Sequence, residues 1–236
     1  MNLTQAKAIV GSIGFPSKMP GTSYGLSAHD CIAGKRLAAI PGTICSSCYA
    51  LRDRASWTNA QKAYSRRLAG TRAPEWVDAM VLILAHLHRN PRLRIDLGVT
   101  GQRRRARGAP PEARYRWNET GYHRWHDSGD LQSVEHLEKI IEVCRRTPQI
   151  RHWLPTRETA ILRACKMPIP DNLTIRVSAT AIDGKVSGGW PFGSTVHTVS
   201  PPAGAHECPA PNQEHMCGDC RACWSRAVPL VSYAKH

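Results

Sequence analysis

Apolar side chains recur at helical spacing in three long stretches of the chain, and each stretch predicts a helix with one buried face. The first stretch follows Tyr49, Pro74 opens the second, and the third begins near Asp130 or Ser133, either of which is a good N-cap residue. The apolar positions are Ala60, Ala63, Tyr64 and Leu68, then Trp76, Val77, Met80, Val81, Leu84 and Leu87, then Leu131, Val134, Leu137, Ile140, Ile141 and Cys144. A shorter helix is expected over residues 158–165.

Short apolar or alternating runs predict the strands. They are residues 93–97, an aromatic-rich run around His123–Trp125, residues 150–154 ending at Pro155, residues 173–180 and residues 194–200. Residues 1–28 predict only a short helix or strand followed by a loop. From the second strand on, the order is strand, helix, strand, helix, strand, which favours βαβ units and a parallel sheet. The expected fold is α/β: a partial (β/α) barrel or an open parallel sheet, with an N-terminal helical part and a cysteine-rich C-terminal segment.

The 236 residues are enough for one domain with a sizeable core. Within that single domain, 1–236, we distinguish an N-terminal cysteine segment (25–50), a basic loop (91–117), a βα core (118–200) and a cysteine-rich C-terminal segment (201–236). No period of 20–50 residues repeats, so a solenoid is not expected.

Polar side chains stand at the predicted ends of the core strands, where parallel α/β folds collect their sites. They are His126, Asp127 and Ser128, then Thr156 and Arg157, then Ser178 to Thr180, then Ser200. We expect these strand ends to converge on one edge, and the C-terminal segment to leave from it. The candidate catalytic residues are His126, Asp127 and Asp130, and the candidate cofactor-binding residues are Ser128, Arg157 and Ser178. N-capping of the following helix is the alternative role for the aspartates.

The C-terminal segment contains Cys217, Cys220 and Cys223 in a C-x2-C-x2-C run, with Cys208 upstream. This spacing matches the first three thiolate ligands of a [4Fe–4S] cluster in bacterial ferredoxins. Zinc is the alternative, although zinc sites usually show two separate C-x2-C pairs. The sequence also leaves open free thiols or disulfides.

A second group near the N-terminus consists of Cys31, Cys45 and Cys48. Two distant groups indicate either one shared metal site or two separate ones. We rank Cys217, Cys220 and Cys223 first as metal ligands, then Cys208, Cys45 and Cys48, then Cys31, which could also be a buried apolar residue. Cys144 and Cys165 fall singly in predicted helices and are expected to be structural.

The charge and the cysteine content indicate in which cellular compartment the protein works and which class of partner it binds. There is no apolar run of membrane-spanning length and no apolar core of a signal peptide, so we expect a cytoplasmic protein with reduced thiols and no membrane partner. The net charge of +14 favours nucleic acid, DNA or RNA, although it could serve solubility alone. The expected phosphate contacts are Arg103, Arg104, Arg105 and Arg107. The aromatic residues Tyr115, Trp117, Tyr122 and Trp125 could stack on bases or pack in a core. The oligomeric state is not indicated.

Three segments resemble a family of tailed-phage proteins, the gene product 88 family. They are Cys45…Cys48-Tyr49-Ala50, the run from Arg124 to Leu131 with its helix, and the strand end Trp153–Thr156. The likeness covers about residues 25–180, and the His-Asp-Ser-Gly-Asp element is its most specific part. The family is in turn distantly similar to radical-SAM enzymes, which implies a cluster on Cys31, Cys45 and Cys48, SAM as a further cofactor, and the host cytoplasm as location. Radical-SAM enzymes typically use C-x3-C-x2-C, whereas Cys31 lies much farther from Cys45 here.

The sequence therefore leaves two main hypotheses and a third. The first is a phage-encoded [4Fe–4S] protein that binds nucleic acid through a basic surface. The second is a radical-SAM-like enzyme acting on a nucleotide or RNA. The third is a structural zinc protein that binds nucleic acid, so whether the protein is an enzyme stays open.

Overall fold

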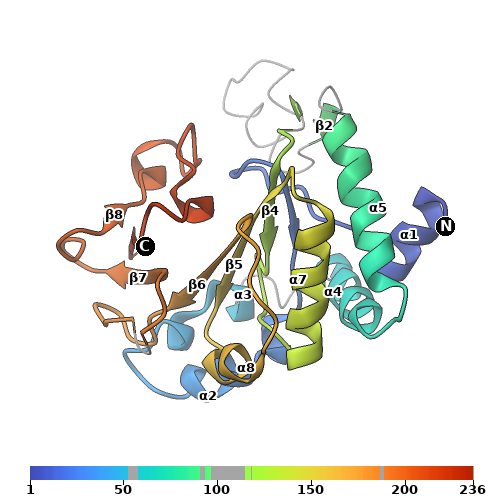
Figure 1. The fold of residues 1–236 in the computed structure, drawn as a ribbon. Coiled ribbons are helices and arrows are strands. Elements are labelled where there is room, and N and C mark those ends of the chain that lie inside the picture. Colours follow the sequence, from blue (N-terminus) through green and yellow to red (C-terminus); the bar gives the residue numbers. More distant parts are fainter. Residues whose placement is uncertain (53–57, 91–93, 97–114, 118, 187–188, 236) are drawn as a thin grey trace.

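The computed structural model describes residues 1–52, 58–90, 94–96, 115–117, 119–186 and 189–235. A twisted sheet runs through the molecule, with helices on one face and the C-terminal segment on the other (Figure 1). The chain is thus an α/β protein with a parallel sheet, as the alternation of strands and helices predicts.

Seven strands form the main sheet in the order β1-β4-β5-β6-β7-β9-β8, and every neighbouring pair is parallel. Their bounds are β1 Thr22–Tyr24, β4 Tyr122–Trp125, β5 Arg151–Thr156, β6 Leu173–Ser178, β7 Gly193–His197, β8 His206–Glu207 and β9 Leu230–Ala234. A separate antiparallel pair joins β2, Arg94–Asp96, to β3, Tyr115–Trp117. The predicted strands 93–97, 123–125, 150–154, 173–180 and 194–200 all correspond to strands of the structure.

One face of the sheet is covered by helices whose apolar sides form the core. They are α1 Leu3–Val10, α4 Thr58–Thr71, α5 Trp76–Arg89, α7 Val134–Arg146 and α8 Thr159–Ala164. In α7 the residues Leu137, Ile140 and Ile141 are fully buried, and Ser133 caps the helix by accepting a hydrogen bond from the His136 N–H at 3.0 Å. Trp125 is fully buried in this core beside Trp76, so it is not available to stack on bases.

The other face is covered by the C-terminal segment instead of α-helices. Its short helix η5, Ala222–Trp224, lies over β5 and β6, and Trp224 packs edge-on against Tyr122 and Trp153. The Trp224 indole N–H donates to the His123 carbonyl at 2.9 Å. The sheet is therefore open, with its second face closed by a segment that follows the core in sequence.

Three features of the sheet differ from the sequence predictions. Residues 22–24 were expected in a loop but form edge strand β1, which pairs with β4. Pro155 was expected to end its strand, but β5 continues to Thr156, and its last three residues pair with β6 alone because the pairing with β4 stops at Trp153. The C-terminal segment was not expected to enter the sheet, yet β9 pairs with β7 over five residues.

The remaining short elements lie near the sheet edges and in the C-terminal segment. They are η1 Ala28–Asp30, α2 Ile32–Ala38, η2 Cys45–Ser47, α3 Tyr49–Arg52 and η4 Ala210–Asn212. No helix among the described residues is both long and apolar enough to cross a membrane. The arginines at 103, 104, 105 and 107 lie outside the described residues.

Candidate functional site

The ends of β4, β5 and β6 meet at one edge, and the buried carboxylate of Asp130 joins two of them. Its Oδ1 accepts hydrogen bonds from the Thr156 hydroxyl at 2.6 Å and the Leu131 N–H at 2.8 Å, and its Oδ2 accepts one from the Arg157 N–H at 2.9 Å. Burial raises the pKa of Asp130 to about 6, although these hydrogen bonds favour the carboxylate. Asp130 thus ties the loop after β4 to the end of β5, and the capping role belongs to Ser133.

Glu158, two residues beyond β5, fixes the start of the N-terminal cysteine segment. Its Oε1 accepts hydrogen bonds from the N–H groups of Ile32 at 3.1 Å and Ala33 at 2.7 Å, which are the first residues of α2. A carboxylate at this position satisfies helix donors that would otherwise lack partners. Cys31 immediately precedes this helix, so Glu158 holds it at the carboxyl edge of the sheet.

Two of the three N-terminal cysteines, Cys31 and Cys45, come together around Gly34. A Cβ built on Gly34 would lie 3.4 Å from the Sγ of Cys31 and 3.9 Å from the Sγ of Cys45, so the two sulfurs share one small volume that a side chain at residue 34 would occupy. Cys48 follows in a tight turn, since its N–H donates to the Cys45 carbonyl at 3.2 Å. The three cysteines thus flank α2 at the sheet edge, Cys31 at its start and Cys45 and Cys48 in the turn η2 that follows it.

A second attachment holds this turn against the end of β6. The Ile44 N–H donates to the Thr180 carbonyl at 2.9 Å, and Thr43 forms a bridge with Ala181. The loop that carries Cys45 and Cys48 is therefore fixed to β6 just as Cys31 is fixed to β5.

The other predicted edge residues have different surroundings. His126 has a left-handed φ of 57° and is buried, and neither ring nitrogen has a hydrogen-bond partner among the described residues. Asp127 packs against Gly25, where any Cβ would lie 2.0 Å from its Oδ1. The buried Ser128 hydroxyl likewise has no partner within the described part of the chain. These three residues line the turn after β4 that faces the cysteine loop, and the Tyr49 hydroxyl donates to the Asp127 carbonyl at 3.1 Å.

Arg157 and Ser178 also lie at this edge. The Arg157 Nε donates to the Ala179 carbonyl at 3.3 Å. Burial raises the pKa of Cys45, and the positive charge of Arg157 opposes that rise. The Ser178 hydroxyl lies 3.1 Å from that of Ser194 on β7. The structure therefore brings the strand-end residues and the N-terminal cysteines to one edge, where the Arg157 charge acts on Cys45.

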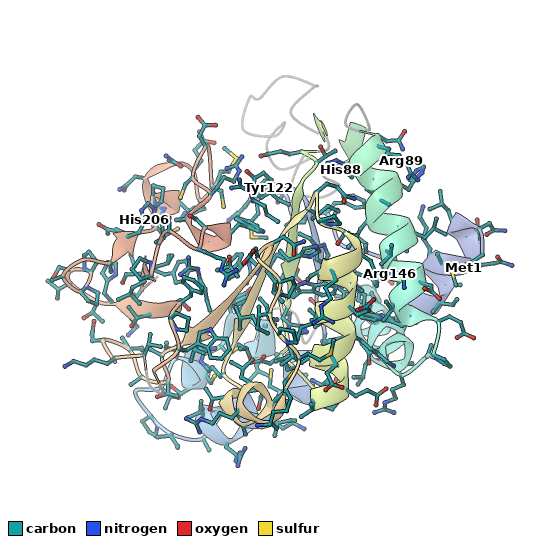
Figure 2. All side chains as sticks on the ribbon, in the orientation of Figure 1. Met1, His88, Arg89, Tyr122, Arg146 and His206 are labelled. Carbon is teal, nitrogen blue, oxygen red and sulfur yellow. The ribbon has the colours of Figure 1, made fainter. Side chains whose placement is uncertain are left out.

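The C-terminal cysteines form a different group on the sheet face opposite α7. Cys223 lies 3.2 Å from the Tyr233 hydroxyl of β9, and the Cys208 N–H donates to the Ser232 carbonyl at 2.8 Å, so both are beside the same part of β9. The Cys220 N–H donates to the Cys217 carbonyl at 3.0 Å, and the Cys220 Sγ lies 3.3 Å from His206 Nε2. In Figure 2 His206 marks this segment, well away from the end of α5 where His88 and Arg89 are labelled.

The two cysteine groups have separate surroundings. The groups that raise the pKa of Cys31, besides burial, are Asp130, Cys45, Cys48 and Glu158. The pKa of Cys217 is raised to about 11 by burial, Cys208 and Cys220, and that of Cys223 to about 12 by burial with Cys208 and Cys217 contributing. The first group is beyond the carboxyl ends of β5 and β6, and the second is over the face of the sheet. A single site shared by both groups does not fit this placement.

All nine cysteines are free thiols in the structure. Within the described residues, no three His, Cys, Asp or Glu side chains already stand at metal-binding geometry, so the thiols of either group would have to turn inward to bind one. Metal sites commonly form together with the local fold, and thiolate is the preferred ligand of zinc and iron–sulfur centres. The donor set of each group therefore fits a soft metal centre.

Cys144 and Cys165 lie away from both groups. Cys144 is fully buried on the apolar face of α7, and Cys165 ends α8 and packs against the same core. These surroundings agree with a structural role for both.

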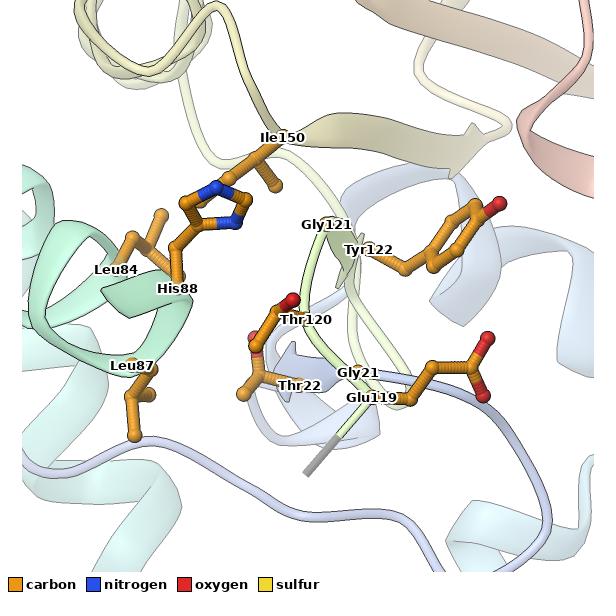
Figure 3. A pocket seen from close by; sticks show the side chains of 10 residues that line it. All are labelled: Gly21, Thr22, Leu84, Leu87, His88, Glu119, Thr120, Gly121, Tyr122 and Ile150. Atoms are coloured by element: carbon orange, nitrogen blue, oxygen red, sulfur yellow. The ribbon is translucent and has the colours of Figure 1, made fainter. Parts of the chain in front are cut away.

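A small pocket opens at the opposite end of the sheet, near the amino ends of β1, β4 and β5 (Figure 3). Leu84, Leu87 and His88 from the end of α5 form one side of it, and Thr22 and Tyr122 lie across from them. None of its ten lining residues is a cysteine or a predicted strand-end residue.

Two residues important to these groups were not singled out from the sequence. Glu158 carries a signal that could have been used, because a glutamate directly after a strand is placed at the sheet edge. Arg176, which is considered below, carries none, because a single arginine within a strand is usually taken as an exposed position.

Comparison with known proteins gives a family but no characterised relative. No curated protein and no solved structure matches the chain. A family described as gene product 88 matches residues 2–226, which is nearly the whole sequence and extends well beyond the segments that carry the resemblance. The chain belongs to the gene product 88 family, the phage protein family that its cysteine and His-Asp-Ser-Gly-Asp motifs resemble.

Proposed function

We propose that this protein is an iron–sulfur protein that holds a [4Fe–4S] cluster at the carboxyl edge of its sheet through Cys31, Cys45 and Cys48. The observation that carries the proposal is the placement of the Cys31 and Cys45 sulfurs around Gly34, at the edge where α/β folds collect their sites. Cys31, which the sequence ranks last among the ligands, is brought to Cys45 by the hydrogen bonds of Glu158.

When bound, such a cluster supplies one-electron chemistry, and three protein thiolates leave one of its irons for another ligand. The neighbouring residues would then set the surroundings of that ligand. Arg157 supplies a positive charge beside Cys45, and the Ser128 hydroxyl offers a polar group not used elsewhere in the described chain. Glu158 holds the start of α2, and the negative charges of Glu158 and Asp130 both act on Cys31.

Anaerobic purification tests this proposal directly. The protein should be brown, with broad absorbance near about 400 nm from thiolate-to-iron charge transfer and about four irons and four sulfides in this centre. A Cys45→Ser, Cys48→Ser variant should lose that iron, whereas Cys165→Ser, away from both groups, should retain it. Colourless protein, or a double variant with the iron content of the wild type, would contradict the proposal.

The second candidate is a radical-SAM-like enzyme acting on a nucleotide or RNA. It is favoured by the presence of three cysteines, rather than four, beside the polar strand ends at the carboxyl edge. The reduced protein would then cleave SAM and release 5′-deoxyadenosine, and Arg157→Ala should lower the yield without removing iron. Absence of this product from cluster-loaded, reduced protein would exclude this candidate.

Nucleic-acid binding is proposed as the role of the positive charge. It rests on the net charge of +14 and on the four arginines at 103, 104, 105 and 107. Each phosphate contact contributes about 0.7 to 0.9 to the slope of log affinity against log salt, so replacing all four should flatten the slope by about 3. Titration of labelled single- and double-stranded oligonucleotides at several salt concentrations measures this slope for the wild type and the variant. If the cluster-loaded protein does not bind oligonucleotides at low salt, the positive charge serves solubility and not nucleic-acid binding. The same titrations compare the affinities for DNA and RNA.

A further inference from the structure

A buried cation beside the C-terminal cysteines lacks a negative partner. Arg176 on β6 is fully buried, and its guanidinium donates to five backbone carbonyls, all neutral. The acceptors are Cys223 at 3.0 Å, Gly193 at 3.2 Å, Ala222 at 2.7 Å, Ser225 at 2.8 Å and Val228 at 2.9 Å. Among the described residues no carboxylate forms an ion pair with it. A buried, uncompensated charge is costly, so its surroundings are expected to supply negative charge.

The groups that interact electrostatically with this guanidinium are Cys223 and Tyr233. Cys223, Cys208 and Cys220 each contact a residue of β8 or β9. Cys223 lies against Tyr233, Cys208 follows β8 beside Ser232 of the same strand, and Cys220 contacts His206 at the start of β8. Cys217 and Cys220 are joined by a turn. The four cysteines thus gather beside β8 and β9, and Cys223 lies next to Arg176, whose Nε donates to its carbonyl.

We propose that Cys208, Cys217, Cys220 and Cys223 form a second metal centre, closed by four thiolates, that fastens the C-terminal segment to the sheet. A zinc ion or a [4Fe–4S] cluster with four thiolates carries a formal charge of about −2, which provides the anion that Arg176 lacks. This centre is distinct from the proposed cluster at the sheet edge and leaves no position open for a substrate. Its role is structural, because its ligands lie within or beside the elements that it would join. Cys208 directly follows β8 and bonds to β9, and Cys223 lies in η5.

The location explains how such a centre would stabilise the fold. The segment from residue 198 to 229 contains only the two-residue strand β8 and two short 3-10 helices, so few backbone hydrogen bonds hold it. The carbonyls bound by Arg176 fix its later part to β6. A metal centre joining Cys208 to Cys223 would close the loop between β8 and η5, and binding of metal would contribute directly to folding.

The test removes one cysteine group at a time and counts metals. In a Cys31→Ser, Cys45→Ser, Cys48→Ser variant, anaerobically purified protein should retain either about one zinc or about four irons with four sulfides per chain. Whether zinc or iron is found tells which of the two metal centres the four C-terminal cysteines bind. In a Cys217→Ser, Cys220→Ser variant this metal should be lost while the iron of the edge cluster remains. Circular dichroism establishes that each variant is folded, and Cys48→Ser alone replaces the triple variant if that variant does not fold.

The outcomes separate this inference from the proposed function. Loss of all metal from the N-terminal variant would overturn the second centre and leave the edge cluster intact as a proposal. Full metal retention in the N-terminal variant, with complete loss in the C-terminal one, would instead overturn the edge cluster. A chelator that removes the metal of the N-terminal variant should also lower its melting temperature and speed proteolysis between residues 198 and 229. Unchanged proteolysis would contradict the structural role.

Discussion

At the scale of single residues, two buried carboxylates organise the sheet edge. Asp130 joins the loop after β4 to the end of β5, and Glu158 joins the end of β5 to the start of α2. Both are almost fully buried, and both accept hydrogen bonds from backbone N–H groups, so their buried oxygens have partners. The position of Cys31 therefore depends on a residue far from it in sequence.

Glu158→Gln tests this dependence. The amide keeps the shape but loses the charge, so the hydrogen bonds to Ile32 and Ala33 weaken and the free energy of unfolding should fall by about 1 to 2 kcal/mol. Iron bound at the sheet edge should fall with it. Glu135→Gln is the matched control, because Glu135 is exposed and forms only a surface ion pair with Lys139. Denaturant unfolding and iron analysis provide the measurements, and equal stability of the two variants would show that Glu158 does not hold the loop.

The lone cysteines provide a second prediction. Cys144→Ser and Cys165→Ser should leave the total of iron and zinc per folded chain unchanged, since both side chains belong to the core beside α7 and α8. Cys144→Ser should lower stability by about 1 to 3 kcal/mol because it buries a hydroxyl. Cys220→Ser should lower the metal content. Elemental analysis of the folded fractions measures the metal content of each variant. A loss of metal only in the Cys144 or Cys165 variants would contradict the ligand assignment.

The sequence predicts some of these residues and not others for a physical reason. Asp130, Arg157 and Ser178 follow apolar runs, and a parallel sheet places all such positions at one edge whatever the details of packing. The proximity of Cys31 to Cys45 could not be predicted, because it depends on α2 and on the bonds of Glu158 across the chain. Asp130 was a candidate cap by local pattern, but Ser133 is closer to the first turn of α7 and takes that role.

At the scale of secondary-structure elements, long periodic helices were predictable and short sheet-edge strands were not. The amphipathic patterns of α5 and α7 contain enough apolar positions to define a buried face. Strand β1 has three residues and β8 has two, too few to show a period. Strand β9 follows a cysteine-rich loop and joins the sheet through pairing with β7, which is a tertiary contact with no local signal.

Arg176 on β6 connects the sheet to this late segment. Arg176→Lys should lower the free energy of unfolding by roughly 3 kcal/mol, because an ammonium has three donors and cannot reach the five carbonyls that the planar guanidinium binds. Arg146→Lys is the matched control, since Arg146 forms an exposed ion pair with Asp78 and should change stability by less than about 1 kcal/mol. Urea unfolding of both variants measures the difference. A similar small effect at both positions would mean that the Arg176 bonds contribute little.

At the scale of the whole molecule, four buried histidines make the fold sensitive to acid. His123, His126, His136 and His152 are buried in the core, and ring contacts join His123 to His152 and His126 to His136. Burial lowers the pKa of each, to about 4 for His136 and about 3 for His152. The core therefore contains neutral imidazoles at neutral pH.

These pKa values predict how stability changes with pH. In the unfolded chain each histidine has a pKa of about 6.5, so below that pH the unfolded state takes up protons that the folded state does not. Stability is therefore fully present above about pH 6.5 and falls as the pH decreases, by up to about 1.4 kcal/mol per pH unit for each histidine. Asp130 acts in the opposite direction between about pH 4 and 6, because its folded pKa is raised, and offsets about one histidine there.

Urea unfolding at a series of pH values from 7 to 5, repeated for His136→Gln and His29→Gln, tests this. His136→Gln removes one buried titrating group and should reduce the slope by about 1.4 kcal/mol per pH unit, although glutamine packs less well and lowers the stability at pH 7. His29 is exposed, so its replacement should leave the slope unchanged. Comparing slopes between variants separates the histidines from acid release of any bound metal, which affects all of them alike. A wild-type stability that does not change over this range, or a slope reduced only by His29→Gln, would show that the buried histidines do not determine the acid response.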